Sequence, residues 1–384
     1  MLSYLSLFLL IFDLAIPPVK FIGSAPFSLL ISIFVLLSHK NRTGLLFELK
    51  NFSIQFFIFY FLFILFVFVR VLFSGELDYL LSIIKSFFIF ISSLFYLMAF
   101  GCNRINDRLI NIFFINGIIC LVAGSIPIVL DVMYLFKNNV RDISIIPYRN
   151  AFLAGYGYFG IAAAYAVIIL LCADKLIRDG FSLRFSIKFI IIMIAGVLAG
   201  RTAFVGIVFS FIYVTFKSIK YSMLSVLLIS GLIAIVLSVN ALSIYSGWMF
   251  EFISFNDGFI SLSHTSSTDE LKEMFFMPSN DITWLWGDGR YVDGEGYYMH
   301  TDSGYMRNLF FGGLPFVIFV IMYACLFAYK SKNIFFWFFI LPLSFLLHYK
   351  GVFILNNPAC VPIFTLLAFW LSHLDRLKGN LNRS

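Results

Sequence analysis

The sequence predicts an all-α polytopic membrane protein with about 12 transmembrane helices and one large polar loop on the outer side. Three observations lead to this fold class: the composition, the length of the apolar segments and the distribution of basic residues. Of the 384 residues, 61% are hydrophobic and only 12% are charged, whereas a soluble domain has about 25% charged residues. This composition excludes a soluble globular protein, a disordered chain and a nucleic-acid-binding protein.

Apolar segments recur along the whole chain. A membrane-spanning helix needs about 20 apolar residues. Windows near that length, each bounded by a polar cluster, lie at 2–16, 20–37, 52–73, 80–100, 109–135, 151–172, 185–200, 202–216, 222–245, 306–328, 333–347 and 353–372. The windows near 16 residues predict helices that tilt little, pack internally or are broken.

The first six spans are separated by loops that alternate in charge. Pro17-Pro18 ends the first span. Because no basic segment precedes this span and Asp13 interrupts it, we interpret it as a retained helix and not as a signal peptide. Basic residues concentrate after the second, fourth and sixth spans, at Lys40, Arg42, Lys50, Arg104, Arg108, Lys175, Arg178, Arg184 and Lys188. These loops are therefore predicted to lie inside.

The last six spans continue the alternation and enclose the long polar insertion. Inner segments carry 16 of the 27 Lys and Arg residues, as the positive-inside rule requires when both termini are inside. Residues 246–305 hold ten of the 20 acidic residues and many large aromatics, which favours an ordered, functional loop. The predicted organisation is a transmembrane bundle of nine helices (1–245), the outer loop (246–305), three further helices (306–372) and an inner tail (373–384).

Charges inside the spans and the cysteines carry further information. Asp13, Arg70 and Lys85 fall near the outer ends of their spans, where they are predicted to snorkel or to contact a lipid-borne anion. No ionisable group is predicted near the midplane, which argues against an ion-driven transporter. The five cysteines have no C-x-x-C spacing, so we predict neither a disulfide nor a metal site built on thiolates.

Two outer motifs of the first half place an arginine where a phosphate could bind. Arg149 follows Tyr148 and precedes a Gly155-Tyr156-Gly157 run, so it suits either a phosphate beside a sugar ring or a headgroup anchor. The second motif, Gly196-Val-Leu-Ala-Gly200, permits close helix contact. Arg201 and Thr202 then open the next helix, whose unpaired N–H groups favour an anion.

Two more motifs lie in and after the large loop. Trp284-Leu-Trp286-Gly287-Asp288-Gly289-Arg290 is a glycine-hinged turn with a third outer arginine. Its acids do not complete an EF-hand loop, so a solvated turn is favoured over a cation site. His300-Thr-Asp302-Ser-Gly-Tyr305 leads into Gly312-Gly313-Leu-Pro315. Asp302 is either a general base, with His300 as its partner or substitute, or the N-cap of the following helix.

Taken together, the order and common sidedness of these motifs resemble the O-antigen polymerase (Wzy) family, within the O-antigen polymerase/ligase group of GT-C-like membrane glycosyltransferases. The matching features are the polytopic layout, the large outer loop, Arg149 with its Gly/aromatic run, Gly200-Arg201-Thr202-Ala203, Gly287-Asp288-Gly289, and Asp302-Ser303-Gly304-Tyr305 followed by Gly312-Gly313. In the ligase branch a His-Asn pair stands in place of Asp302-Ser303, which favours a polymerase, while His300 keeps the ligase alternative open. A lipid-linked oligosaccharide flippase is a further alternative, although it predicts polar residues at mid-bilayer.

The resemblance implies an enzyme at the periplasmic face of the bacterial inner membrane. It would transfer a growing glycan from undecaprenyl pyrophosphate onto a hydroxyl of the next lipid-linked repeat unit, without a cofactor, a metal or a nucleic acid. Membrane lipid, a flippase and a chain-length regulator are the other expected partners. Guanidinium groups suit the developing phosphate charge, a carboxylate or imidazole suits proton removal, and aromatic or hydroxyl groups suit sugar binding. The candidates for the phosphate charge are Arg201, Arg149 and Arg290. The candidate for proton removal is Asp302 or His300. The candidates for substrate binding are Tyr148, Thr202, Trp284, Trp286 and Tyr305.

Overall fold

The computed structural model describes residues 1–16, 23–38, 43–137, 147–218, 253–256, 259–262, 272–294 and 296–381. It is 79% helical. Five of the described helices are long and apolar enough to cross a membrane: Glu48–Ser74, Leu77–Phe100, Ile105–Ser125, Tyr158–Asp179 and Gly304–Ser331. The prediction of a helical, membrane-embedded protein is confirmed at this level.

Every regular element in the first half of the described chain is a helix. Its elements are α1 (Leu2–Phe12), α2 (Ala25–Ser38), α3 (Thr43–Ser74), α4 (Leu77–Phe100), α5 (Ile105–Ser125), α6 (Pro127–Tyr134), α7 (Pro147–Asn150), α8 (Tyr158–Asp179), α9 (Leu183–Ala199) and α10 (Ala203–Lys217). The second half adds two short antiparallel hairpins. Its elements are β1 (Ile253–Asn256), β2 (Phe259–Leu262), α14 (Asp281–Trp286), β3 (Val292–Asp293), β4 (Gly296–Tyr297), η2 (Tyr298–His300), α15 (Gly304–Ser331), η3 (Phe336–Ile340), α16 (Leu341–Lys350) and α17 (Cys360–Leu381).

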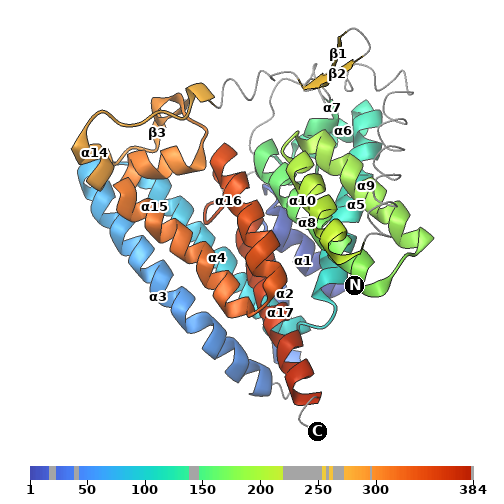
Figure 1. The fold of residues 1–384 in the computed structure, drawn as a ribbon. Helices are drawn as coiled ribbons and strands as arrows, with labels where there is room; N and C mark the ends of the chain where they lie inside the picture. The colour runs from blue at the N-terminus through green and yellow to red at the C-terminus, as the bar shows by residue number, and fades with distance from the viewer. Residues whose placement is uncertain are drawn as a thin grey trace.

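The hairpins, α14 and α7 gather at one end of the helical bundle, and the C terminus lies at the opposite end (Figure 1). The helix α8 forms the centre of the core, with 83% of its apolar window buried. A Cβ added to Gly206 of α10 would lie 2.5 Å from the Cα of Ala166 on α8, and one added to Gly200 would lie 3.1 Å from the Cβ of Ala162. The small residues therefore permit close helix contact, as the Gly196-to-Gly200 spacing predicts.

Some predicted spans are shorter or divided in the structure. The window 109–135 contains two helices, α5 and α6, because Pro127 begins a new helix and leaves Ile126 extended; the residue before a proline disfavours the helical conformation. The windows 151–172 and 353–372 begin as irregular chain, and their helices start at Tyr158 and Cys360. The predicted span 222–245 lies outside the described residues, as do 246–252, 257–258, 263–271 and 295 of the loop 246–305.

The prediction that Asp13 and Lys85 snorkel is wrong. Lys85 Nζ of α4 lies 2.6 Å from Asp13 Oδ2 at the end of α1, and the Asp13 side chain is only 2% exposed. The backbone N–H of Ala25 also donates to Asp13 Oδ1, at 3.3 Å. The two charges neutralise one another, so the pair connects the first helix to the fourth.

Candidate functional site

The helix α15 is broken about two turns after the predicted His300–Tyr305 motif. Gly313 has a φ of 69°, and Pro315 follows it. Because proline has no N–H, the carbonyl of Phe311 loses its helical donor. The N–H of Gly289 donates to this carbonyl at 3.1 Å, and that of Asp288 donates to the carbonyl of Phe310 at 2.6 Å. The turn after α14 therefore supplies the donors that the broken helix needs.

Two glycine motifs predicted from the sequence pack directly against each other here. A Cβ on Gly287 would lie 2.6 Å from the backbone nitrogen of Gly312, and a Cβ on Gly313 would lie 2.5 Å from the carbonyl oxygen of Leu285. Both Gly287 and Gly313 have a φ of +69°, a conformation that glycine adopts without strain. We call this contact between residues 285–290 and 310–313 the α14–α15 junction.

The junction gives a direct test of its own packing. The Gly287→Ala variant should become susceptible to protease within residues 272–303, because the added methyl group would overlap the backbone of residues 311–313 and would occupy a position with a positive φ. The overlap adds about 1–3 kcal/mol to a backbone cost of about 1–3 kcal/mol, because a φ of 69° with a ψ of 176° is a region that essentially only glycine adopts. The measurement is limited proteolysis of the purified protein, with the native protein beside it.

Gly294 is a matched control for this substitution. It has a φ of +57°, and a Cβ there meets nothing within 4 Å. The Gly294→Ala variant therefore carries the cost of a positive φ without any steric overlap. Equal behaviour of the two variants would show that contact at the junction contributes nothing.

Arg70 of α3 holds the junction from the side, which the prediction of snorkelling did not anticipate. Its Nη2 donates to the carbonyl of Gly287 at 2.9 Å. A Cβ on Gly289 would lie 3.0 Å from the same nitrogen. Arg70 thus positions the glycine turn.

Arg307, in the first turn of α15, has the most unusual surroundings of the described arginines. Its guanidinium lies 3.9 Å from the ring centroid of Tyr291 and 3.7 Å from that of Tyr297. Its Nε is buried and has no hydrogen-bond partner among the described residues. Contact with two ring faces leaves the in-plane N–H groups of a guanidinium available for an acceptor that takes two parallel hydrogen bonds, such as two oxygens of a phosphate. The sequence placed Arg307 within the tenth span, between two motifs, but gave no signal for the two rings.

Residues at the start of α4 hold one of these rings in place. Glu76 Oε2 accepts from the backbone N–H of Tyr291 at 2.6 Å, and the Tyr79 ring lies 4.0 Å from the Tyr291 ring. Burial raises the pKa of Tyr291, so its hydroxyl stays neutral. Glu76 therefore has a structural role here, since it fixes the backbone that carries the Tyr291 ring.

The predicted aromatic and arginine residues near α14 differ in availability. Trp284 donates its Nε1–H to the carbonyl of Pro278 at 3.0 Å, whereas Trp286 is 58% exposed. The Arg290 guanidinium lies 5.9 Å from the Tyr298 ring centroid. Asp288 accepts from the Thr283 hydroxyl at 2.6 Å and from the Tyr298 hydroxyl at 3.2 Å. Trp286 and Arg290 are thus exposed groups of the site, and Asp288 organises the turn.

The entrance of α15 decides one of the alternatives for Asp302. The N-cap residue is Ser303, and its side chain makes no capping hydrogen bond. Asp302 is exposed, as is His300, which has a φ of 53°. The N-cap interpretation of Asp302 is therefore wrong, and the proton-transfer interpretation stays a prediction.

Two side chains near this entrance are tied to the neighbouring helix. The Tyr305 hydroxyl donates to the carbonyl of Phe345 at 3.2 Å. His348 is fully buried; its Nδ1 accepts from the N–H groups of Phe353 and Ile354 at 3.1 and 3.2 Å. Its Nε2 lies 2.9 Å from Asn308 Nδ2. His348 therefore positions the connection between α16 and α17, a role that the sequence did not indicate.

The remaining predicted residues form a second group, at the starts of α8 and α10. The Arg149 guanidinium lies 4.5 Å from the ring centroid of Tyr158, and the Tyr148 hydroxyl lies 3.1 Å from the Ser125 hydroxyl. Lys137 approaches the Tyr158 ring at 5.9 Å, and burial lowers its pKa to about 8. This side of the bundle is cationic as well.

Arg201 and Thr202 occupy the turn between α9 and α10. Thr202 is buried at the N-cap position of α10 but makes no capping hydrogen bond, and Arg201 is half-buried.

The connection 351–359 lies between the two groups. A Cβ on Gly351 would lie 2.9 Å from the Phe159 ring of α8, and one on Gly304 of α15 would lie 2.8 Å from the Gly351 carbonyl oxygen. The predicted residues thus fall into a junction group (Trp284, Trp286, Arg290, His300, Asp302 and Tyr305, joined by Arg307) and an α8–α10 group (Tyr148, Arg149, Arg201 and Thr202). Both groups border one short connection at the same end of the bundle.

The described residues contain no candidate metal site, and the comparisons with known proteins found no match. Among the residues that the structure describes, no group of three His, Cys, Asp or Glu side chains could hold a metal ion. Comparisons with protein families, with curated proteins and with solved structures found no match to this chain.

Proposed function

We propose that this chain is an O-antigen polymerase of the Wzy type, a GT-C-like glycosyltransferase that acts on undecaprenyl-pyrophosphate-linked repeat units. The observation that carries the proposal is Arg307, stacked between two tyrosines beside the glycine turn of the α14–α15 junction. A planar guanidinium with its edge available suits a pyrophosphate, and neighbouring exposed aromatics suit a sugar. The resemblance of the motifs supplies the substrate class.

The proposed reaction balances without a cofactor. A hydroxyl oxygen of the acceptor sugar attacks the anomeric carbon of the growing glycan, and the bond from that carbon to the phosphate oxygen breaks. The electron pair leaves with undecaprenyl pyrophosphate, where Arg307 and Arg290 stabilise the developing charge. Asp302 takes the proton of the attacking hydroxyl, with His300 as the substitute base.

The two groups of site residues support a polymerase in a second way. Both substrates of a polymerase carry a pyrophosphate, one on the donor and one on the acceptor. The junction group and the α8–α10 group each contain arginine and tyrosine, on either side of the connection 351–359. We assign the donor to the junction group and the acceptor to Arg149, Arg201 and Thr202, with Tyr148 beside its sugar.

The proposed topology has twelve spans in the bacterial inner membrane, with both termini in the cytoplasm and the site facing the periplasm. A flippase that delivers the repeat units and a chain-length regulator are the proposed partners. The helix ends that carry the site residues are the ends that the positive-inside rule assigns to the periplasmic side of the membrane.

Cysteine labelling tests this orientation. A Ser266→Cys variant, altered in the loop 246–305, should react with a membrane-impermeant maleimide in intact cells. Background should be low because four of the five native cysteines are buried and Cys325 is half-buried. A Ser182→Cys variant, at the exposed start of α9, is the matched inner control and should react only after permeabilisation. The reverse result would invert the topology.

Deletion of the gene, followed by gel analysis of surface polysaccharide, tests the function itself. Loss of a polymerase should leave one repeat unit on the lipid acceptor. Loss of a ligase should leave none, and loss of a flippase should leave unexported lipid-linked units in the cell. Either of the last two patterns would replace the proposed activity.

A further inference from the structure

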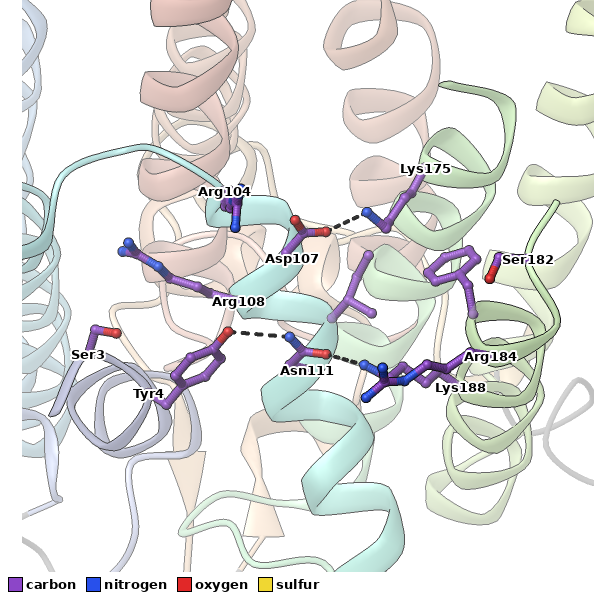
Figure 2. Close-up of a pocket in the computed structure, with 12 residues that line it drawn as sticks. Ser3, Tyr4, Arg104, Asp107, Arg108, Asn111, Lys175, Ser182, Arg184 and Lys188 are labelled. Carbon is purple, nitrogen blue, oxygen red and sulfur yellow. Dashed lines mark hydrogen bonds and ion pairs between the residues drawn. The ribbon is translucent and has the colours of Figure 1, made fainter. Parts of the chain in front are cut away.

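A second polar site lies at the end of the bundle away from the α14–α15 junction. A cavity of about 620 Å³ opens between the start of α1, the start of α5, the end of α8 and the start of α9 (Figure 2). The candidate functional site uses the opposite end of α8, at Tyr158. The cavity is therefore separate from that site and is large enough for a small-molecule headgroup.

Positive charge dominates the cavity lining. It contains one carboxylate, Asp107, and five cationic side chains: Arg104, Arg108, Lys175, Arg184 and Lys188. Lys175 is neutralised locally, since its Nζ lies 2.6 Å from Asp107 and 2.7 Å from Asp179. Among the described residues, the other four cations have no carboxylate partner. Four unneutralised cations around one hollow favour an anion there.

Neutral hydrogen bonds hold two of these cations in place without cancelling their charge. Lys188 Nζ donates to Asn111 Oδ1 at 2.8 Å, and Asn111 Nδ2 donates to the Tyr4 hydroxyl at 3.4 Å. Arg108 donates to the carbonyl of Phe100 through both terminal nitrogens, at 3.3 Å each. Figure 2 shows the chain from Tyr4 through Asn111 to Lys188 crossing the cavity, with Arg184 beside Lys188.

The surroundings of the cavity are apolar. Leu5 follows Tyr4 on α1, Ile187 precedes Lys188 on α9, and Ile115 lies one turn beyond Asn111 on α5; all three side chains are exposed. An anion that carries acyl chains would place its charge in the cavity and its chains along these side chains. Basic pockets between helix ends bind anionic lipid headgroups in this manner.

We propose that this cavity binds the phosphate group of an anionic phospholipid from the leaflet at the inner end of the bundle. Arg104, Arg184 and Lys188 contact the phosphate, Arg108 adds long-range attraction, and Asn111 keeps Lys188 extended. The proposal does not depend on the activity of the other site.

Thermal unfolding of the purified full-length protein in a neutral detergent tests the proposal. Dioleoylphosphatidylglycerol should raise the Tm by about 3–6 °C more than dioleoylphosphatidylcholine does. An Arg184→Gln/Lys188→Gln variant should lose most of this difference. A Lys217→Gln variant removes an exposed lysine at the C-terminal end of α10, outside the cavity lining. This variant should keep the difference in Tm between the two lipids.

The outcomes separate the sources of the phosphate. Sodium pyrophosphate that stabilises the native protein but not the double variant, with no effect of phosphatidylglycerol, would keep the anion site and overturn the lipid assignment. An equal shift in native protein and double variant would overturn the site. If the double variant does not fold, Arg104→Gln, at an exposed position, replaces it with the same two outcomes.

Discussion

Replacement of Arg307 by lysine should abolish visible polymer almost as completely as replacement by alanine. Lysine keeps the charge, but it can neither fill the flat space between the Tyr291 and Tyr297 rings nor present two parallel donors to a phosphate. Removal of one preorganised donor to developing negative charge lowers the rate by about 10²–10³ in well-studied oxyanion sites. The measurement is polymer length on gels, together with the amount of protein in the membrane.

Substitutions of Tyr297 separate stacking from hydroxyl chemistry. Tyr297→Phe keeps the ring face and should keep polymer, whereas Tyr297→Leu should reduce it. Lys217→Ala serves as a control for the general loss of a cation. Full-length polymer from Arg307→Lys would reduce Arg307 to a generic charge, and full-length polymer from Arg307→Ala would remove it from the mechanism.

The Asp302→Asn variant should lose about 10²–10⁴ in turnover while reaching the membrane in normal amount, since a general base typically contributes a factor of that size. Asparagine keeps the shape of the side chain but cannot accept the proton of a sugar hydroxyl. Because Ser303 and not Asp302 is the N-cap residue of α15, loss of a cap should not confuse the result. The assay is initial rate on purified lipid-linked repeat units, with membrane abundance measured in parallel.

Two further variants identify the residue that accepts the proton. Asp293→Asn alters an exposed acid of the β3–β4 hairpin and should leave turnover unchanged. If His300→Ala loses turnover and Asp302→Asn does not, the base is His300. Normal turnover in both variants would contradict acid–base catalysis by this segment.

Apolar windows alone predicted several helices accurately. The windows 80–100, 185–200, 202–216 and 306–328 agree with α4, α9, α10 and α15 to within one helical turn, because each is bounded by glycine, charge or a polar turn. The window 109–135 failed, since its hydrophobicity continues through Pro127 although the helix does not. Hydropathy measures the fit of a segment to lipid and does not register a local backbone break.

The candidate site was predictable as a set of motifs but not as an arrangement. The Gly287–Gly289 and Gly312–Gly313 motifs were both visible in the sequence, yet the contact between them depends on the carbonyls that Pro315 frees. Arg307 was visible only as a charge within a span, because its two ring partners come from a separate hairpin segment. Long-range contacts of this kind have no local periodicity from which they could be predicted.

The ion pair between buried Asp13 and half-buried Lys85 constrains the order in which the helices can pack during synthesis. Leaving one member of a fully buried ion pair without its partner costs about 3–5 kcal/mol, and the cost is smaller here because the Lys85 side chain is 36% exposed. Asp13 leaves the ribosome about 70 residues ahead of Lys85, and at about 5–20 residues per second several seconds separate the two. Throughout that interval the carboxylate at the end of α1 lacks the ammonium group of Lys85, so the contact between the first helix and the fourth forms only after the fourth has been made.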